Sequence, residues 1–514
     1  MALVAGLLLV AGCADDPAEP LSLEPPPLVP AAALADHAVD DAVAKLDGLA
    51  EQLMADSGIP GMAVAVVHGG KTVYAKGFGV KNTIAGDADA NEVHPDTVFQ
   101  LASLSKPISA SVVAHQVGGG AISWDTPVVD KLPWFALSDP VVTRMVTVGD
   151  LFAHRSGLPD HAGDQLEDLG YDRGQVLRRL RELPLTQFRT SYAYTNFGLT
   201  AAAEAVATSV GTPWEVLADE TIFTPLGMTT ASYRFADYAA RDNRALGHVR
   251  VDGGYRPEFV RDADTQAPAG GVSASVEDVA RWLAMILGNG TADGKQVVDP
   301  AALLPALTPQ ITSDRATQLD MRSGSYGYGF NVSTTSAART QLSHSGAFEL
   351  GAATNFLILP SADVAIVALT NATPTGVPET LTAQFADLVQ FGRIREDWRE
   401  LYRKAFAHLA EPVGSLVGRP PPVDPAPAGP LGRYLGDYAN PYWGTAHITA
   451  RDGALVLALG PKLSVPLRHW DGDVFTFALG GENAPPGSLS KAAFTDHTLV
   501  LEYFDDDGMG TFTR

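Results

Sequence analysis

VFQLASLSKPISASVVAHQVGGG, residues 98–120, joins a helical pattern to a serine and a lysine three positions apart. Its apolar residues recur at helical intervals: Leu104, Ile108 and Val112. Pro107 falls in the first turn, where its missing N–H is tolerated, and the triple glycine ends the pattern. We therefore predict a helix that begins near Ser103, with Lys106 one turn later on the same face.

Ser103 and Lys106 could form an activated nucleophile. A serine hydroxyl needs a nearby base before it attacks a carbonyl, and a lysine can serve as that base where burial disfavours its ammonium form. At a helix N-terminus the backbone N–H of Ser103 would also face developing negative charge. The tetrad alone does not decide the matter, because S-x-x-K at a helix start is usually a cap beside a solvated lysine.

The same tetrad, SLSK, occurs again at Ser488 to Lys491. It follows GENAPPG and precedes AAFTDHTLVLEYF, so we predict a turn that leads into a strand. Side chains at positions i and i+3 of a strand point to opposite faces. Ser488 and Lys491 should therefore not converge, and we predict that only the first copy is catalytic.

Two further polar elements follow the first tetrad along the chain. YAYTNFG places Tyr194 and Asn196 at the start of the apolar stretch LTAAAEAVA, a second predicted helix start. LSHSGAFELG places His344, Ser345 and Gly346 just before a predicted apolar strand. The chain thus carries S-x-x-K, Y-x-N and H-x-G in that order.

This order of motifs resembles the class C β-lactamase-like serine hydrolases, which also include D-Ala-D-Ala carboxypeptidases, D-amino peptidases and esterases. Penicillin-binding proteins and related lactamases carry S-x-x-K with comparable second and third elements. TVGDLFAHRSGLPD, Thr147 to Asp160, is similar to a further landmark of the family. The resemblance covers about residues 40–410.

The resemblance implies a catalytic role for three side chains. Ser103 would attack a carbonyl and form an acyl-enzyme, and Lys106 would accept or relay its hydroxyl proton. Tyr194, as a phenolate or a hydrogen-bonded phenol, would share the role of base and protonate the leaving group. Neither a metal nor an organic cofactor is expected.

The resemblance also implies residues that bind the substrate. Asn196 would hold Lys106 and a substrate amide. The backbone N–H groups of Ser103 and of Ala347, which follows Gly346, would form the oxyanion hole.

His344 stands where the lactamases usually carry a lysine. A histidine is mostly neutral at pH 7, whereas a lysine is a permanent cation for a substrate carboxylate. Esterase or peptidase activity is therefore favoured over efficient handling of β-lactams. We expect any preference for anionic substrates to strengthen below about pH 6.5, as His344 protonates. The alternative is a turn histidine that does not contact substrate.

The first residues, MALVAGLLLVAGCADD, predict export. Their apolar run is too short to span a bilayer and resembles a signal peptide. VAGC ends in Cys13, the single cysteine of the chain, and resembles a bacterial lipoprotein signal in which that cysteine is acylated. We expect residues 1–13 to be the signal and 14–36 a Pro-rich tether, which predicts a lipid-anchored protein on the periplasmic or extracellular face of a membrane. The alternative is a chance buried cysteine.

The remaining patterns predict an α+β fold with a second domain. Residues 59–80 have the pattern of a hairpin, and three strands are predicted near 326–370. We expect residues 37–412 to form an antiparallel sheet flanked by helices, with an inserted helical region, as in β-lactamases and transpeptidases. A Pro-rich linker would span 413–430 and a small all-β barrel or sandwich 431–514. The aromatic residues of this module either line a pocket or, as we expect, fill its core: Tyr434, Tyr438, Tyr442, Trp443 and Trp470.

Composition narrows the partners. The net charge of −23 argues against nucleic acid, whose phosphates would be repelled. His154 and His161 lack the spacing of a zinc motif, and Asp505 to Asp507 lack that of a calcium loop. A small molecule or a short peptide, such as one derived from peptidoglycan, is the expected partner, and no oligomeric state is predicted.

These observations predict a serine hydrolase that cleaves an amide or ester through an acyl-enzyme on Ser103. The substrate class, whether D-amino acid peptide, ester or β-lactam, stays open. An alternative from another class is a penicillin-recognising sensor that acylates with little or no turnover. A third hypothesis, a wall-binding β module beside a degenerate hydrolase, is disfavoured by the intact set of Ser103, Lys106 and Tyr194.

Overall fold

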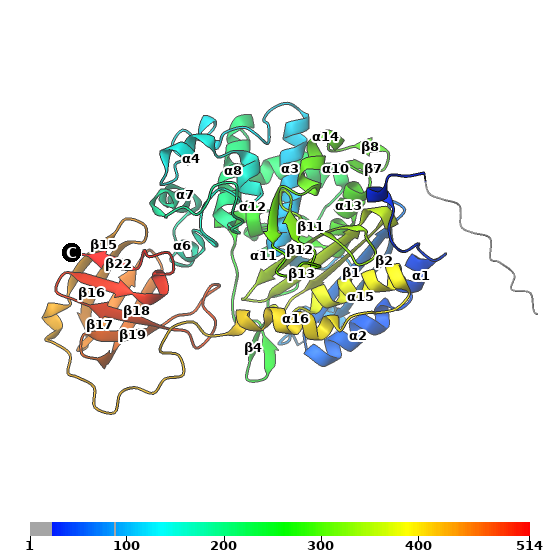
Figure 1. The fold of residues 1–514 in the computed structure, drawn as a ribbon. Coiled ribbons are helices and arrows are strands. Elements are labelled where there is room, and N and C mark those ends of the chain that lie inside the picture. Colours follow the sequence, from blue (N-terminus) through cyan, green and yellow to red (C-terminus); the bar gives the residue numbers. More distant parts are fainter. Residues whose placement is uncertain (1–22, 87–88) are drawn as a thin grey trace, which may run out of the picture.

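The computed structural model describes residues 23–86 and 89–514, so the predicted lipid attachment at Cys13 lies outside the described residues. An α/β body and a C-terminal β-barrel lie side by side (Figure 1). Within the described ranges, no helix has both the length and the apolarity to cross a bilayer.

In the described part of the chain, the body is built on an eight-stranded sheet in the order β2-β1-β14-β13-β12-β11-β10-β9. All neighbouring strands pair antiparallel. The first hairpin closes at Gly69 and Gly70, whose φ angles of 61° and 71° favour glycine. The strands are β1 (Gly61–His68), β2 (Lys71–Gly79), β9 (Ile311–Asp314), β10 (Gly324–Tyr326), β11 (Asn331–Thr334), β12 (Thr340–Phe348), β13 (Ala352–Leu359) and β14 (Val364–Thr370).

Both faces of the sheet are covered, and alternate residues of its central strands enter different cores. In β1, Ala63 and Ala65 pack with the helical region, whereas Met62 and Val64 pack on the opposite side. The second side is covered by terminal helices: α1 (Ala38–Val43), α2 (Leu46–Ser57), α15 (Val377–Phe391) and α16 (Trp398–Phe406).

The helical region between β2 and β9 covers the first side of the sheet (Figure 1). Its helices are α3 (Ser105–Gly118), α4 (Pro140–Met145), α5 (Val148–Phe152), α6 (Asp164–Asp168), α7 (Arg173–Arg179), α8 (Asn196–Val210), α9 (Trp214–Ala218), α10 (Thr224–Leu226), α11 (Phe235–Ala239), α12 (Ala267–Gly270), α13 (Val276–Leu287) and α14 (Pro300–Leu303). Short strands between them form three two-stranded pairs: β3 (Val98–Gln100) with β6 (Ser273–Ser275), β4 (Val249–Val251) with β5 (Gly254–Arg256), and β7 (Thr291–Ala292) with β8 (Lys295–Gln296). The predicted sheet with an inserted helical region is confirmed.

The structure corrects two details of the strand prediction. His344 to Gly346 precede the predicted apolar strand, β13, but they themselves lie in β12, a strand that was not predicted. YGYGFNV forms two short strands, β10 and β11, rather than one. Because β11 pairs with β12 only as far as Ser343, the segment from His344 to Phe348 pairs with β13 alone.

The C-terminal strands close into a barrel, which settles the predicted choice between barrel and sandwich. They are β15 (Gly436–Asn440), β16 (Gly444–Arg451), β17 (Ala454–Leu459), β18 (Leu463–Asp471), β19 (Val474–Ala478), β20 (Leu489–Phe494), β21 (Thr498–Leu501) and β22 (Thr511–Thr513). Tyr434 and Tyr438 are buried and pack against Phe494, as expected of core aromatics. The long loop between β19 and β20 reaches the α/β body, where Asn483 meets Asp168.

Candidate active site

Ser103 lies on a strained turn at the start of α3. A 3-10 turn, Ala102–Leu104, runs directly into the helix, and Ala102 has a φ of 48°, a conformation that alanine rarely adopts. The hydroxyl of Ser105 donates to the Ala102 carbonyl at 2.6 Å and accepts from the N–H of Val272 at 2.9 Å. These bonds fix the turn and hold Ser103 at the cavity wall.

Lys106 reaches back to the serine, as the helical spacing predicted. Its Nζ donates to Ser103 Oγ at 2.9 Å, to Asn196 Oδ1 at 2.6 Å and to the carbonyl of Ala269 at 3.0 Å. The side chain is fully buried. Burial lowers the pKa of Lys106 to about 7, and the nearby Asp164 opposes that shift.

Asn196 joins the lysine to Asp164, at the N-terminal turn of α6. The amide nitrogen of Asn196 donates to Asp164 Oδ2 at 2.8 Å, which leaves the amide oxygen to accept from Lys106. His161 bonds the same carboxylate oxygen at 2.9 Å through Nδ1, and this bond raises the pKa of His161. Sequence reasoning missed Asp164; it follows the TVGDLFAHRSGLPD landmark, but no motif spacing marks it.

Tyr194 completes the group from the segment before α8. Its ring lies 4.5 Å from Lys106 Nζ. Burial raises the pKa of Tyr194 well above its usual value, and a hydrogen bond with Ser103 only partly opposes that shift. The raised pKa favours the hydrogen-bonded phenol over the phenolate, the two forms considered from the sequence.

The TVGDLFAHRSGLPD segment, Thr147 to Asp160, packs against Tyr194. The ring of His154 lies 4.5 Å from that of Tyr194, and its Nδ1 accepts the N–H of Thr195 at 3.1 Å. Asp150 pairs with Arg155 and Arg189, each at 2.8 Å, and anchors this loop. These residues position the site rather than contact the cavity.

Strand β12 packs closely against the Ala102–Leu104 turn, and Gly346 is its residue at the point of contact. A Cβ on Gly346 would collide with the carbonyl oxygen of Leu101 and with Thr354 Oγ1, and would lie 3.0 Å from the backbone nitrogen of Ser103. Only glycine permits this approach. It brings Ser345 and Ala347, which alternate with the buried Gly346, to the cavity wall.

His344 does not fulfil the expectation placed on it. Its side chain is buried with its ring 6.3 Å from that of Tyr194, and it does not line the cavity. Nδ1 donates to the carbonyl of Ser345 at 2.6 Å, so Nε2 accepts from the hydroxyl of Tyr326 at 2.9 Å. Burial and the neighbouring Lys106 lower the pKa of His344 to about 3. The structure therefore disfavours the expected protonation below about pH 6.5, because burial leaves little solvent to stabilise a charged imidazole.

A cavity of about 500 Å³ opens in front of Ser103, Tyr194 and Asn196. The barrel supplies part of its wall: Tyr442, Trp443, Glu482, Asn483, Pro485, Asp506 and Asp507. Tyr442 and Trp443 are buried and also line the cavity, so the alternative of pocket-lining aromatics holds for these two residues.

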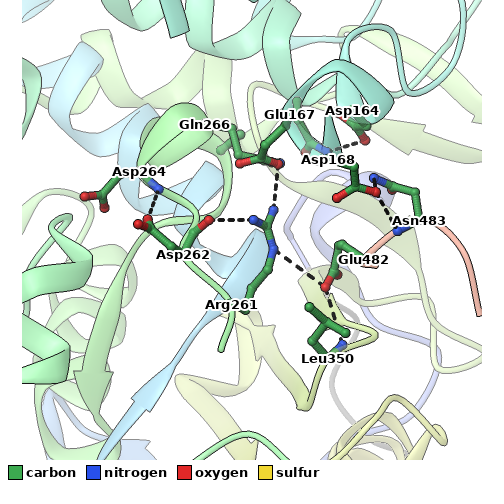
Figure 2. Close-up of polar contacts among 12 residues, drawn as sticks. Asp164, Glu167, Asp168, Arg261, Asp262, Asp264, Gln266, Leu350, Glu482 and Asn483 are labelled. Carbon is green, nitrogen blue, oxygen red and sulfur yellow. Dashed lines mark hydrogen bonds and ion pairs between the residues drawn. The ribbon is translucent and has the colours of Figure 1, made fainter. Parts of the chain in front are cut away.

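Polar contacts hold the barrel against this cavity (Figure 2). Arg261 lies between Glu167 of the body at 2.7 Å and Glu482 of the barrel at 3.6 Å. The carboxylate of Glu482 also accepts the backbone N–H of Glu349 at 2.9 Å. Asn483 donates to Asp168 at 2.9 Å. The barrel is thus part of the site and not a separate appendage.

The second SLSK copy has no catalytic geometry. Ser488 is buried just before β20, where its hydroxyl donates to Pro485 at 2.6 Å and accepts the N–H of Val413 at 3.0 Å. Lys491 pairs with Glu502 at 3.1 Å instead. Across the described ranges, no group of three or more His, Cys, Asp or Glu residues is arranged to hold a metal ion.

Comparison with known proteins places this site in a family. Residues 46–391 match the family model described as beta-lactamase, and residues 420–502 match a domain of unknown function. An unguisins hydrolase of Aspergillus campestris is 26% identical over 76% of this chain and 73% of its own. Penicillin-binding protein 4 of Amycolatopsis lactamdurans is 29% identical over 73% of this chain and 94% of its own.

The fold comparison agrees. The octameric penicillin-binding protein homologue from Pyrococcus abyssi superimposes with a TM-score of 0.59 at 19% identity, covering 90% of this chain and 98% of its own. The family model spans more than half of the chain and contains the Ser103, Lys106 and Tyr194 site. The chain therefore belongs to the beta-lactamase family of serine hydrolases.

Proposed function

We propose that this protein hydrolyses an ester or amide through an acyl-enzyme on Ser103. The observation that carries the proposal is the buried Lys106 amine, 2.9 Å from Ser103 Oγ, with a pKa lowered by burial to about 7. An amine with that pKa is largely available as a base near neutral pH.

The hydrogen bonds of Lys106 favour this role. Its partners at Asn196 Oδ1 and Ala269 O can only accept, so a neutral amine still donates to both. Its lone pair then faces Ser103 Oγ. In the first step the lysine takes the hydroxyl proton while the oxygen bonds to the substrate carbonyl carbon.

The later steps use the same groups. The backbone N–H groups of Ser103 and Ala347 stabilise the oxyanion of the tetrahedral intermediate. As the carbon–oxygen or carbon–nitrogen bond to the leaving group breaks, that group takes a proton from the Lys106 ammonium, relayed by the Tyr194 hydroxyl. Water then attacks the ester of Ser103 with Lys106 again as base. Lys106 returns that proton to Ser103 Oγ as the acyl–oxygen bond breaks, which releases the acid and the free serine.

A fluorophosphonate label located by mass spectrometry tests the nucleophile. We expect one label on Ser103 in the wild type and in Ser488→Ala, and none in Ser103→Ala. Labelling of the Ser103→Ala protein at another serine would overturn the proposal.

The similarity to a penicillin-binding protein keeps a second candidate open, a sensor that acylates but does not turn over. A chromogenic ester separates the two. A steady rate after the initial burst supports the hydrolase, whereas a stoichiometric burst with no further product supports the sensor.

A further inference from the structure

The cavity in front of Ser103 is strongly acidic. Its lining carries these carboxyl groups: Asp160, Asp164, Glu349, Glu411, Glu482, Asp506 and Asp507. The basic side chains in the same lining are fewer: His161, Arg261 and His408. Both domains contribute, since Glu482, Asp506 and Asp507 belong to the barrel and the other acids precede it.

We call the carboxyl groups of this lining the acidic wall. Arg261 does not neutralise the acidic wall as a whole, because its guanidinium is already paired. Its guanidinium pairs with Glu167 at 2.7 Å and Glu482 at 3.6 Å, and donates to the carbonyl of Asp262 at 2.7 Å (Figure 2). Asp164 and Asp160 lie 2.9 and 3.9 Å from His161 instead. The other carboxylates of the lining lie outside these pairs. A substrate carboxylate would meet their repulsion and would find no free arginine.

Asp164 independently points to a missing partner. The residue is only 4% exposed and lines the cavity. His161 and Asn196 both bond Oδ2, whereas Oδ1 is buried with no hydrogen-bond partner among the described residues. Buried carboxylate oxygens are nearly always satisfied, so a donor from a ligand is the natural partner for Oδ1.

Like charges also meet across the domain junction. Burial raises the pKa of Asp507, and Asp506 of the barrel and Asp160 of the body raise it further. For Glu349, burial raises the pKa to about 7. Carboxyl groups gathered in this manner repel one another until a cation joins them.

We propose that this acidic wall selects ester or amide substrates that carry an ammonium group near the scissile carbonyl. The cation would be held between Asp164 Oδ1 inside the cavity and the barrel carboxylates Asp506 and Asp507 at its mouth. This inference rests on the proposed hydrolase function. A bound cation would also counter the effect of Asp164 on Lys106, so the lysine would stay a neutral base.

Three p-nitrophenyl esters of matched length test the charge preference: 4-(ammoniomethyl)benzoate, whose N–H groups can donate to Asp164, its neutral isostere 4-ethylbenzoate, and 4-(sulfonatomethyl)benzoate. For the full chain we expect kcat/KM to be at least about tenfold higher for the cationic ester than for the neutral one, and lowest for the sulfonate. The preference should shrink as salt rises from low to about 0.5 M, because salt screens the partly exposed carboxylates.

Paired variants assign the preference to the wall. Asp506→Asn with Asp507→Asn should reduce the cationic-to-neutral ratio about fivefold, as expected for two partly exposed ion pairs. Asp160→Asn, which removes a carboxylate that the body contributes, should also reduce the cationic-to-neutral ratio. The matched control, Asp424→Asn with Asp452→Asn, removes two charges outside the cavity lining and should keep the ratio.

The outcomes separate this inference from the function beneath it. The cation site is overturned if hydrolysis depends on Ser103 but shows no preference for the cationic ester. It is also overturned if that preference survives the loss of Asp506 and Asp507. Neither result contradicts the proposed hydrolase activity. If none of the three esters acylates Ser103, the hydrolase proposal itself fails.

Discussion

The two SLSK segments of this chain are identical in sequence and opposite in environment. Ser103 Oγ and Lys106 Nζ lie 2.9 Å apart at a helix start, beside a cavity. Ser488 and Lys491 belong to the barrel, where the serine bonds the backbone and the lysine pairs with Glu502. Four residues therefore do not define a nucleophile; the secondary structure and the residues that surround them do.

The difference in solvent access explains the difference in chemistry. Lys106 is fully buried, and its one nearby carboxylate, Asp164, acts through Asn196. Lys491 is partly exposed and has a direct carboxylate partner. Burial without a direct counter-ion favours the neutral amine, whereas a direct ion pair favours the ammonium.

The largest contrast should come from removing each lysine. We expect Lys106→Met to lower kcat/KM on a chromogenic ester by about 100- to 10,000-fold, because the general base is lost. Lys491→Met should change the rate little and the free energy of unfolding by no more than about 1 kcal/mol. Equal losses of activity in both variants would break the contrast between the two segments.

Gly346→Ala tests the close approach that only the first segment has. The added methyl would collide with the carbonyl oxygen of Leu101 and press on the turn that carries Ser103. We expect a destabilisation of about 1–3 kcal/mol in thermal or urea unfolding and a loss of ester hydrolysis. Gly432→Ala, where nothing lies within 4 Å, is the control and should leave hydrolysis intact.

The pH profile sharpens the contrast through Lys106. Because its pKa is lowered to about 7, the neutral base form dominates above that pH and is lost below it. The rate of Ser103 acylation should therefore fall about tenfold per pH unit well below pH 7 and level off above it. His344, with a pKa lowered to about 3, should add no transition between about pH 5 and 8. A flat profile from pH 5 to 9 contradicts the assignment of Lys106 as base.

Ser488→Ala should give the smallest effect and should affect stability alone. The hydroxyl bonds Pro485 and Val413, so its loss leaves the N–H of Val413 without that acceptor. We expect the free energy of unfolding to drop by about 1–2 kcal/mol, with hydrolysis unchanged. A loss of fluorophosphonate labelling in this variant would place chemistry in the barrel after all.

Only the site residues that a local sequence pattern marks could be predicted. Helical periodicity in α3 predicted the Ser103 and Lys106 pair, and motif order predicted Tyr194 and Asn196 as their partners. His344 was misjudged because its neighbours are separate in sequence: β12 buries the imidazole against Tyr326. Asp164 and the barrel loop at Glu482 were missed because neither has a local pattern that links it to Ser103.

By itself, the sequence determined the elements of this protein: the helix that carries its nucleophile, the sheet built from both ends of the body, and an all-β module at the C-terminal end. Periodicity and turn residues act over a few positions, so they are legible in one chain. The tertiary structure alone decided which lysine is buried, that His344 stays neutral, and that the barrel forms part of the cavity wall. Burial and charge depend on residues that lie well outside any local sequence pattern, and only folding brings those residues together.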